Sequence, residues 1–70
     1  MKIIKARVPA GNTVLIQEVL LYTIEEAKAI LFGLDWQFGG DIYDTKETNK
    51  RIGWIASCDD GTGIYVEVKK

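Results

Sequence analysis

The chain has 70 residues, the size of one small domain, so residues 1–70 are predicted to fold as a single unit. It contains one cysteine and no histidine, which excludes an intramolecular disulfide and a zinc site of the usual Cys/His kind. The formal net charge of −1 argues against nucleic acid as a partner, because binding through phosphates needs a clear basic excess.

The chain begins with two predicted strands, residues 2–8 and 13–21, in which apolar side chains recur at alternate positions. A two-residue loop at 11–12 would set apolar residues of the two strands opposite one another. The pairs would be Val8 with Leu15 and Ile4 with Val19. Ile16 and Leu20 then fall on the opposite face. Either that face is covered as well, or a bulge changes the phase within the second strand.

The strongest local signal is the start of a helix after the second strand. Thr23 and Glu26 have the spacing of a capping box, in which each side chain accepts a hydrogen bond from the backbone amide of the other residue. An apolar stripe at helical spacing follows, made of Ile24, Ala27, Ile30, Leu31 and Leu34. Gly33 is placed to end the helix in the left-handed conformation.

Three further strands are predicted after the helix, at residues 41–47, 51–58 and 63–69. The glycine pair at 39–40 precedes them and is interpreted as a turn. A three-residue loop at 59–61, with Gly61 left-handed, would set the apolar faces of the last two strands opposite each other. These faces consist of Ile52, Trp54, Ala56 and Cys58 on one strand and Ile64, Val66 and Val68 on the other.

The order of elements is therefore β-β-α-β-β-β. It predicts an α+β fold in which a single helix packs on one face of a mainly antiparallel five-stranded sheet. A β-grasp arrangement, in which the last strand also pairs with the first, is the alternative.

Two resemblances bear on this prediction. Residues 1–4 and the capped helix at 23–30 resemble the first half of ubiquitin and other β-grasp domains. The chain ends in Val68, Lys69 and Lys70 without a diglycine, so the resemblance does not imply conjugation. In size and order of elements the chain is similar to small phage-encoded anti-CRISPR proteins. That resemblance implies a compact inhibitor that occupies a surface of a bacterial defence complex.

The cellular location follows from the same composition. No segment is long and apolar enough to span a membrane, so no membrane partner is expected. The N-terminal residues lack the pattern of a signal peptide. A single unpaired cysteine is typical of a reducing compartment. We therefore expect a cytoplasmic protein.

The residues for catalysis are sparse. Cys58 has no histidine to activate it and shares an apolar face with Trp54, so it is interpreted as an inert core thiol. Asp41 and Asp44 are three residues apart in a predicted strand and would point to opposite faces. No glycine-rich phosphate loop precedes a helix. The sequence therefore predicts a non-catalytic protein that needs neither cofactor nor metal.

A cluster of aromatic residues follows the helix and suggests a binding surface. The residues are Phe32, Trp36, Phe38 and Tyr43, with Asp35 and Asp41 between them. In one interpretation Trp36 and Phe38 wrap the helix end and close the core. In the other the aromatic side chains form a partly exposed patch rimmed by acidic residues, as in many protein interfaces. The patch could bind another protein or a second copy of this chain.

A basic sheet face is the alternative site. Its residues are Lys5, Arg7, Lys50 and Arg51. With Tyr43 or Trp54 they could bind single-stranded nucleic acid or a nucleotide by stacking and phosphate contacts. The leading prediction is a protein-binding module. A nucleic-acid-binding domain and a structural homodimer subunit are the alternatives.

Overall fold

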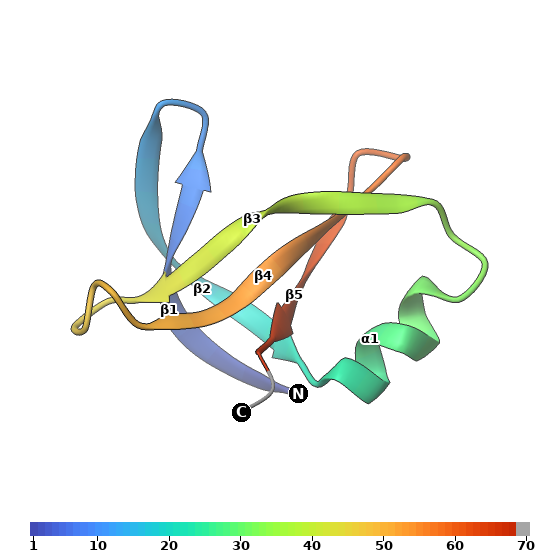
Figure 1. Ribbon diagram of the computed structural model, residues 1–70, viewed down its shortest axis with the longest axis horizontal. Coiled ribbons are helices and arrows are strands. Elements are labelled where there is room, and N and C mark those ends of the chain that lie inside the picture. Colours follow the sequence, from blue (N-terminus) through green and yellow to red (C-terminus); the bar gives the residue numbers. More distant parts are fainter. Residues whose placement is uncertain (69–70) are drawn as a thin grey trace.

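The computed structural model describes residues 1–68 of the chain. Within that range, five strands and one helix follow one another in the expected order (Figure 1). They are β1 (Lys2–Ala10), β2 (Thr13–Tyr22), α1 (Ile24–Leu31), β3 (Trp36–Asp44), β4 (Arg51–Cys58) and β5 (Gly63–Glu67). Strands make up most of the structure, and the helix has only 8 residues.

The strands do not form the predicted open sheet. They close into a barrel in the order β1-β2-β5-β4-β3, and β3 returns to pair with β1. The α+β prediction of a helix packed on an open sheet is therefore wrong. The β-grasp alternative is also wrong, because β5 pairs with β4 and, in parallel, with β2, but not with β1. The prediction missed the closure because it rested on hairpins between sequence neighbours, whereas closure depends on two long-range pairings.

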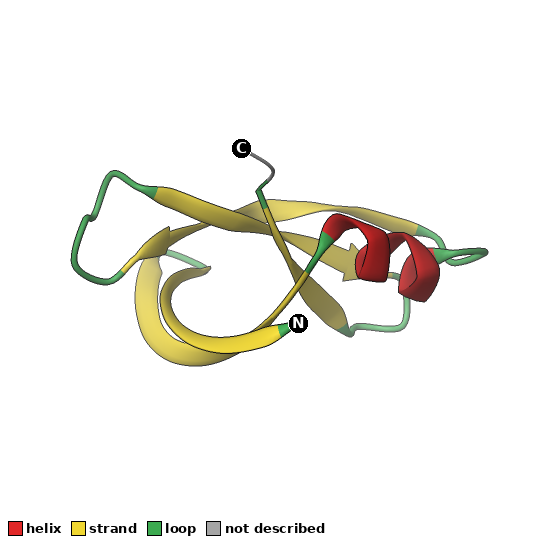
Figure 2. Cartoon of the chain, turned by 90° about the horizontal axis from the view of Figure 1, so that it is seen from below, coloured by secondary structure: helices red, strands yellow, loops and turns green. Residues whose placement is uncertain are grey.

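These two pairings are short. β1 pairs with β3 only through Ala6 and Arg7, and β2 pairs with β5 only through Leu21 and Tyr22. Beyond these points the strands diverge, so the tip of the β1–β2 hairpin stands apart from β3, β4 and β5 (Figure 1). The hairpin is strongly curled, as the view from below shows (Figure 2). This curl lets β1 reach β3 while β2 reaches β5.

The β1–β2 hairpin has the predicted register. Both expected pairs are present, Val8 with Leu15 and Ile4 with Val19. Gly11 in the loop has a φ of 62°, a conformation that glycine adopts without strain. The pairing runs unbroken along β1, so β2 contains no bulge, and Ile16 is 65% exposed. Neither explanation offered for the second face holds at Ile16, where that face is uncovered, whereas Leu20 farther along the strand is partly buried.

The main core lies inside the barrel. Its buried members are Ala6, Val8, Val19, Leu21 and Ile42. Partly buried side chains pack around them, namely Ile4, Ile52, Ile55 and Tyr65. The core residues of β1 and β2 alternate with outward-facing residues, as the period of two along a strand requires.

The capping box of α1 is confirmed. The amide of Glu26 donates to Thr23 Oγ1 at 3.1 Å, and the amide of Thr23 donates to Glu26 Oε1 at 2.9 Å. The N-terminal ammonium of Met1 lies 2.8 Å from the same Glu26 oxygen. The helix begins where the sequence predicts because these bonds satisfy amides that have no partner within the helix.

The apolar stripe of α1 is narrower than predicted. Ala27 and Leu31 are buried against the outside of the barrel, but Ile30 is 39% exposed and Leu34 is 54% exposed. Gly33, with a φ of 78°, ends the helix as expected. The helix stops at Leu31, so Leu34 lies beyond it and does not share its buried face.

Strand β3 begins five residues earlier than predicted. The glycine pair at 39–40 is not a turn but lies inside the strand, where the register to β4 shifts between Phe38 and Gly40. Gly40 has a φ of 124°, which other residues rarely adopt, so the pair forms a bulge. A glycine pair predicts a turn or a bulge equally well, and only pairing with β4 distinguishes the two. The expected strand 41–47 instead ends at Asp44.

The β4–β5 hairpin agrees with its predicted register. Trp54 lies opposite Val66 and Ala56 opposite Ile64, and Gly61 has a positive φ of 90°. The fifth strand ends at Glu67 rather than at residue 69, which lies outside the described residues.

Candidate functional site

An apolar groove lies between α1 and the outer face of β3, β4 and β5. It has a volume of about 450 Å³. Its lining consists of Ile24, Ala27, Lys28, Leu31, Phe32, Trp36, Trp54 and Val66. Seven of these eight side chains are apolar, and the groove is open to solvent. A shaped apolar hollow on a rigid frame is the usual form of a site that binds another molecule.

Three aromatic side chains stack across β3 and β4 beside this groove. The rings of Trp36 and Trp54 are 5.3 Å apart between centroids, with an interplanar angle of 32°. The ring of Phe38 lies 6.3 Å from that of Trp54, at 30°. Both distances are within the range of favourable aromatic pairs. Trp54 therefore holds the two exposed β3 side chains in place.

Three of the four aromatic residues after the helix are exposed, and Tyr43 is partly buried. Phe32 is 88% exposed, Phe38 58% and Trp36 43%. Trp36 and Phe38 are therefore exposed, as in the second interpretation, but Asp41 and Tyr43 do not lie beside them. Phe32 follows the last residue of α1, and its backbone leaves the helical conformation there, with a ψ of 121°. Its side chain lines the groove and makes little contact with the rest of the chain.

The other predicted partner-binding residues lie elsewhere. Asp35 is exposed next to Asp59 and Asp60, and the amide of Asp59 donates to the carbonyl of Asp35 at 3.3 Å. The Thr62 hydroxyl donates to Asp60 Oδ1 at 2.6 Å, which is the main cause of the lowered pKa of that carboxyl. This acidic corner flanks Trp36, the next residue along the chain from Asp35. It does not enclose the groove.

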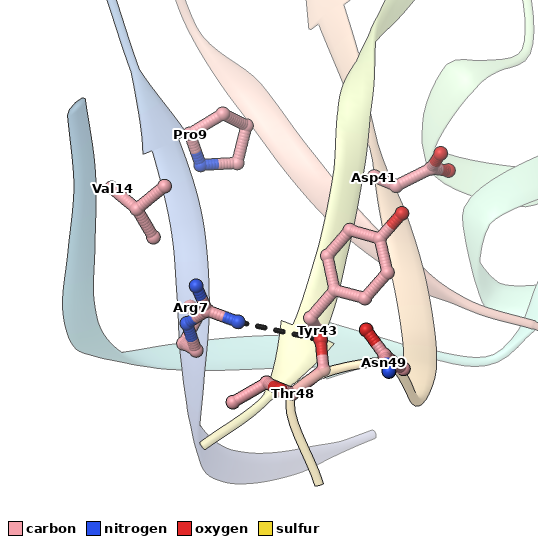
Figure 3. A pocket seen from close by; sticks show the side chains of 7 residues that line it. All are labelled: Arg7, Pro9, Val14, Asp41, Tyr43, Thr48 and Asn49. Atoms are coloured by element: carbon pink, nitrogen blue, oxygen red, sulfur yellow. Dashed lines mark hydrogen bonds between the residues drawn. The ribbon is translucent and has the colours of Figure 1, made fainter. Parts of the chain in front are cut away.

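Asp41 and Tyr43 line a second hollow, of about 480 Å³, shown in Figure 3. It lies between the β1–β2 hairpin and the loop after β3. Its remaining lining residues are Arg7, Pro9, Val14, Thr48 and Asn49. The six predicted residues are thus divided, with Phe32, Trp36 and Phe38 at the groove, Asp41 and Tyr43 here, and Asp35 at the acidic corner.

The loop that closes this second hollow is ordered by Asp44. The amide of Lys46 donates to Asp44 Oδ1 at 2.7 Å, and this bond is the largest cause of the lowered pKa of the carboxyl. The amide of Asp44 in turn donates to the carbonyl of Lys50 at 2.9 Å. These bonds hold the ends of the loop together, which positions Thr48 and Asn49 over the hollow.

The predicted basic face is not assembled in one place. Arg7 donates to the carbonyl of Thr48 at 3.3 Å, and Arg51 Nε lies 2.7 Å from Asp41 Oδ1 as an ion pair. Lys50 and Arg51 both line a different hollow, together with Lys2 and Glu67. Lys5 is exposed and sits opposite Glu18 in the β1–β2 register. Two of the four predicted cations are therefore engaged within the chain.

Trp54 is an aromatic residue of the groove that the sequence did not assign to the partner-binding set. The sequence assigns Trp54 to an apolar face with Cys58, and this assignment does not predict a contact with Trp36. The contact follows from the register of β3 with β4. Once β3 begins at Trp36, the register sets Trp36 opposite Cys58 and Phe38 opposite Ala56, which brings both rings to the same face as Trp54.

Other chemistry has few groups available. Cys58 is a free, partly buried thiol beside the acidic corner. Among residues 1–68, no three Cys, Asp or Glu side chains lie close enough together to hold a metal ion. In the same range no helix is long and apolar enough to cross a membrane.

Comparisons with known proteins found no similarity that bears on this site. No protein-family model matches the chain, and no curated protein or solved structure matches it either.

Proposed function

We propose that this chain is a non-catalytic protein-binding module that occupies the surface of a larger protein through its apolar groove. The observation that carries the proposal is the exposure of Phe32, Phe38 and Trp36 around a groove with an ordered aromatic floor. Aromatic anchors are the side chains that most often dominate binding energy in protein interfaces. Phe32, at 88% exposure, contributes little to the core, so a contact with a partner is the best reason for its apolar character.

A protein is a better partner for this groove than a nucleic acid. The net charge is −1, and Asp35 with its acidic neighbours lies beside the groove. Of the basic residues that could bind phosphates, Arg7 and Arg51 already have partners within the chain. Phosphate binding depends on free cations gathered on one face. Because the cations here are dispersed, a protein partner is favoured.

The class of target is also a proposal. The resemblance in size and element order to phage-encoded anti-CRISPR proteins suggests an inhibitor of a bacterial defence complex. The free thiol of Cys58 supports action in the cytoplasm. Steric occupation requires no reacting group, which agrees with the lack of candidate catalytic residues in the sequence.

The experiment is a pull-down from bacterial lysate with matched variants. Wild-type protein, Phe32→Ala and Trp36→Ala are compared with Ile3→Ala, an exposed apolar residue that does not line the groove. Each lysate is tested with and without nuclease. We expect the wild type to capture a lysate protein whether or not nuclease is present. Ile3→Ala should capture the same protein, and both groove variants should lose it. Equal capture by all four proteins would place the binding site elsewhere. Capture that vanishes with nuclease would favour the nucleic-acid alternative.

A further inference from the structure

Strand β2 has one free edge. On one side it pairs with β1 along its whole length, from Thr13 to Leu21. On the other side it pairs with β5 only at Leu21 and Tyr22. Between the rest of β2 and β5 lies a hollow of about 310 Å³, lined in part by Glu18 and Ile64. The contact across it is between side chains, because Gln17 Nε2 donates to the Tyr65 hydroxyl at 3.1 Å. Residues 13–18 of β2 are all exposed, and the tip of the hairpin projects from the barrel (Figure 1).

The hairpin geometry identifies the backbone groups at this edge. Ala10 and Thr13 flank the two-residue turn and form the hydrogen-bonded pair that closes it. Hydrogen-bonded pairs then recur at every second residue, so Leu15 and Gln17 also direct their N–H and C=O groups toward β1. Val14, Ile16 and Glu18 direct theirs away from β1. No strand of residues 1–68 pairs with these three residues on that side.

The edge has few of the features by which proteins usually prevent strand pairing. Such features are charged side chains (lysine above all), proline, a bulge, or a covering element, and of these residues 13–18 have only the charge of Glu18. The free edge of β3 has one of them, the glycine bulge at 39–40. β2 has neither lysine nor proline, its pairing with β1 is regular, and β-branched Val14 and Ile16 are 48% and 65% exposed. This segment is therefore suited to accept another strand.

We propose that the free edge of β2 pairs with the same edge of a second copy of this chain, antiparallel about a two-fold axis at Ile16. Ile16 then lies opposite Ile16 of the second copy, and Val14 lies opposite Glu18 in both directions. This register joins Val14, Ile16 and Glu18 of each copy in hydrogen-bonded pairs. Two curled hairpins become one continuous four-stranded sheet.

A second copy suits this edge because the edge is self-complementary. Contacts across a two-fold axis use the same patch on both chains. In the proposed register Glu18 faces an apolar residue rather than another acid, so like charges do not meet across the seam. Arg7 sits beside Ile16 on the outer face of β1, which places the two copies of Arg7 on the outer strands, with both β2 strands between them.

The oligomeric state in solution tests the proposal. Sedimentation equilibrium from micromolar to millimolar protein is measured for the wild type, Ile16→Lys and Ile3→Lys. Both substitutions add one charge at similarly exposed sites, of 65% and 67% exposure, but only Ile16 lies on the free edge of β2, whereas Ile3 lies on β1. We expect a dimer for the wild type and for Ile3→Lys, and a monomer for Ile16→Lys with an unchanged circular dichroism spectrum. A monomeric wild type at millimolar concentration, or a dimer that persists in Ile16→Lys, would overturn it.

The register is tested by cross-linking. In a Cys58→Ser background, Ile16→Cys should form a disulfide-linked dimer under mild oxidation, because directly paired residues at a two-fold lie about 5.5 Å apart between Cα atoms. Ile3→Cys is the control and should remain monomeric on a non-reducing gel. Equal cross-linking of both would contradict the register. This edge is separate from the groove, so Trp36→Ala should leave the dimer intact whatever its effect on partner binding.

Discussion

Trp36 and Trp54 lie with their ring centroids 5.3 Å apart, although they are not opposite each other in the β3–β4 register. Trp36 is paired with Cys58, so its indole reaches along the strand to meet Trp54. Phe38 approaches the same indole at 6.3 Å. Trp54 thus contacts two exposed rings at once. It supports the groove, whereas the exposed rings are free to bind a partner, and these two roles separate the residues.

That separation predicts different effects of aromatic substitutions on stability. Trp54→Ala should lower the free energy of unfolding by about 2 kcal/mol, less than a fully buried Trp because the side chain is only partly buried. Phe32→Ala should change it by less than about 0.5 kcal/mol, since the side chain is 88% exposed. Urea unfolding followed by tryptophan fluorescence or circular dichroism measures both. Equal losses in the two variants would show that Phe32 is part of the core.

Gly53 is expected to be essential for packing. A Cβ at this position would lie 2.5 Å from the carbonyl oxygen of Val66 and 3.1 Å from Leu21 Cδ1. Since these atoms belong to the backbone of β5 and to the core, Gly53→Ala should cost about 1–3 kcal/mol of stability. Gly63→Ala is the control, because its nearest neighbour would be 3.2 Å away and at the strand end. A thermal denaturation midpoint for Gly53→Ala above that of Gly63→Ala would contradict this prediction.

The cap of α1 predicts a further change in stability. Thr23→Ala removes the acceptor for the amide of Glu26 and should lower the free energy of unfolding by about 1 kcal/mol. Thr23→Ser keeps the hydroxyl and should lose much less. Chemical denaturation of the two variants gives the comparison, and equal loss in both would assign the effect to the methyl group of Thr23 instead.

The same helix terminus predicts a dependence on pH. The pKa of Glu26 is lowered from its ordinary value of 4.5, first by the hydrogen bond from the N-terminal ammonium and then by the Thr23 amide. Because the folded-state pKa is the lower one, this stabilisation is complete above about pH 4.5 and is lost as the pH falls through the folded-state value. Glu26→Gln should therefore be less stable than the wild type at neutral pH.

In acid the difference between Glu26→Gln and the wild type should disappear, since Glu26 is then protonated in both the folded and the unfolded chain. Urea denaturation repeated at several pH values gives this comparison. Glu25→Gln, in the same exposed first turn, is the control and should show a smaller difference at neutral pH. A difference between Glu26→Gln and the wild type that is constant with pH would rule out the carboxylate as its source.

Local chemistry predicted several parts of the fold correctly. The Thr23–Glu26 capping box, the register of β1 with β2 and the register of β4 with β5 were all read from residues close together in the chain. The start of β3 was missed because Gly39 and Gly40 suit a turn as well as a bulge. With the strand start missed, the alignment of Trp36 and Phe38 over Trp54 could not be predicted.

The sequence by itself determined the order of the elements, the ends of the helix and two hairpin registers, because turn geometry, capping and side-chain alternation act over a few residues. Only the tertiary structure decided that the sheet closes into a barrel, that Phe32 and Phe38 are exposed, and that β2 keeps a free edge. Closure depends on pairing Arg7 with Tyr43 and Leu21 with Tyr65, which are far apart in the chain. Such pairings follow from how far the β1–β2 hairpin curls, a property of the packed core rather than of any local motif.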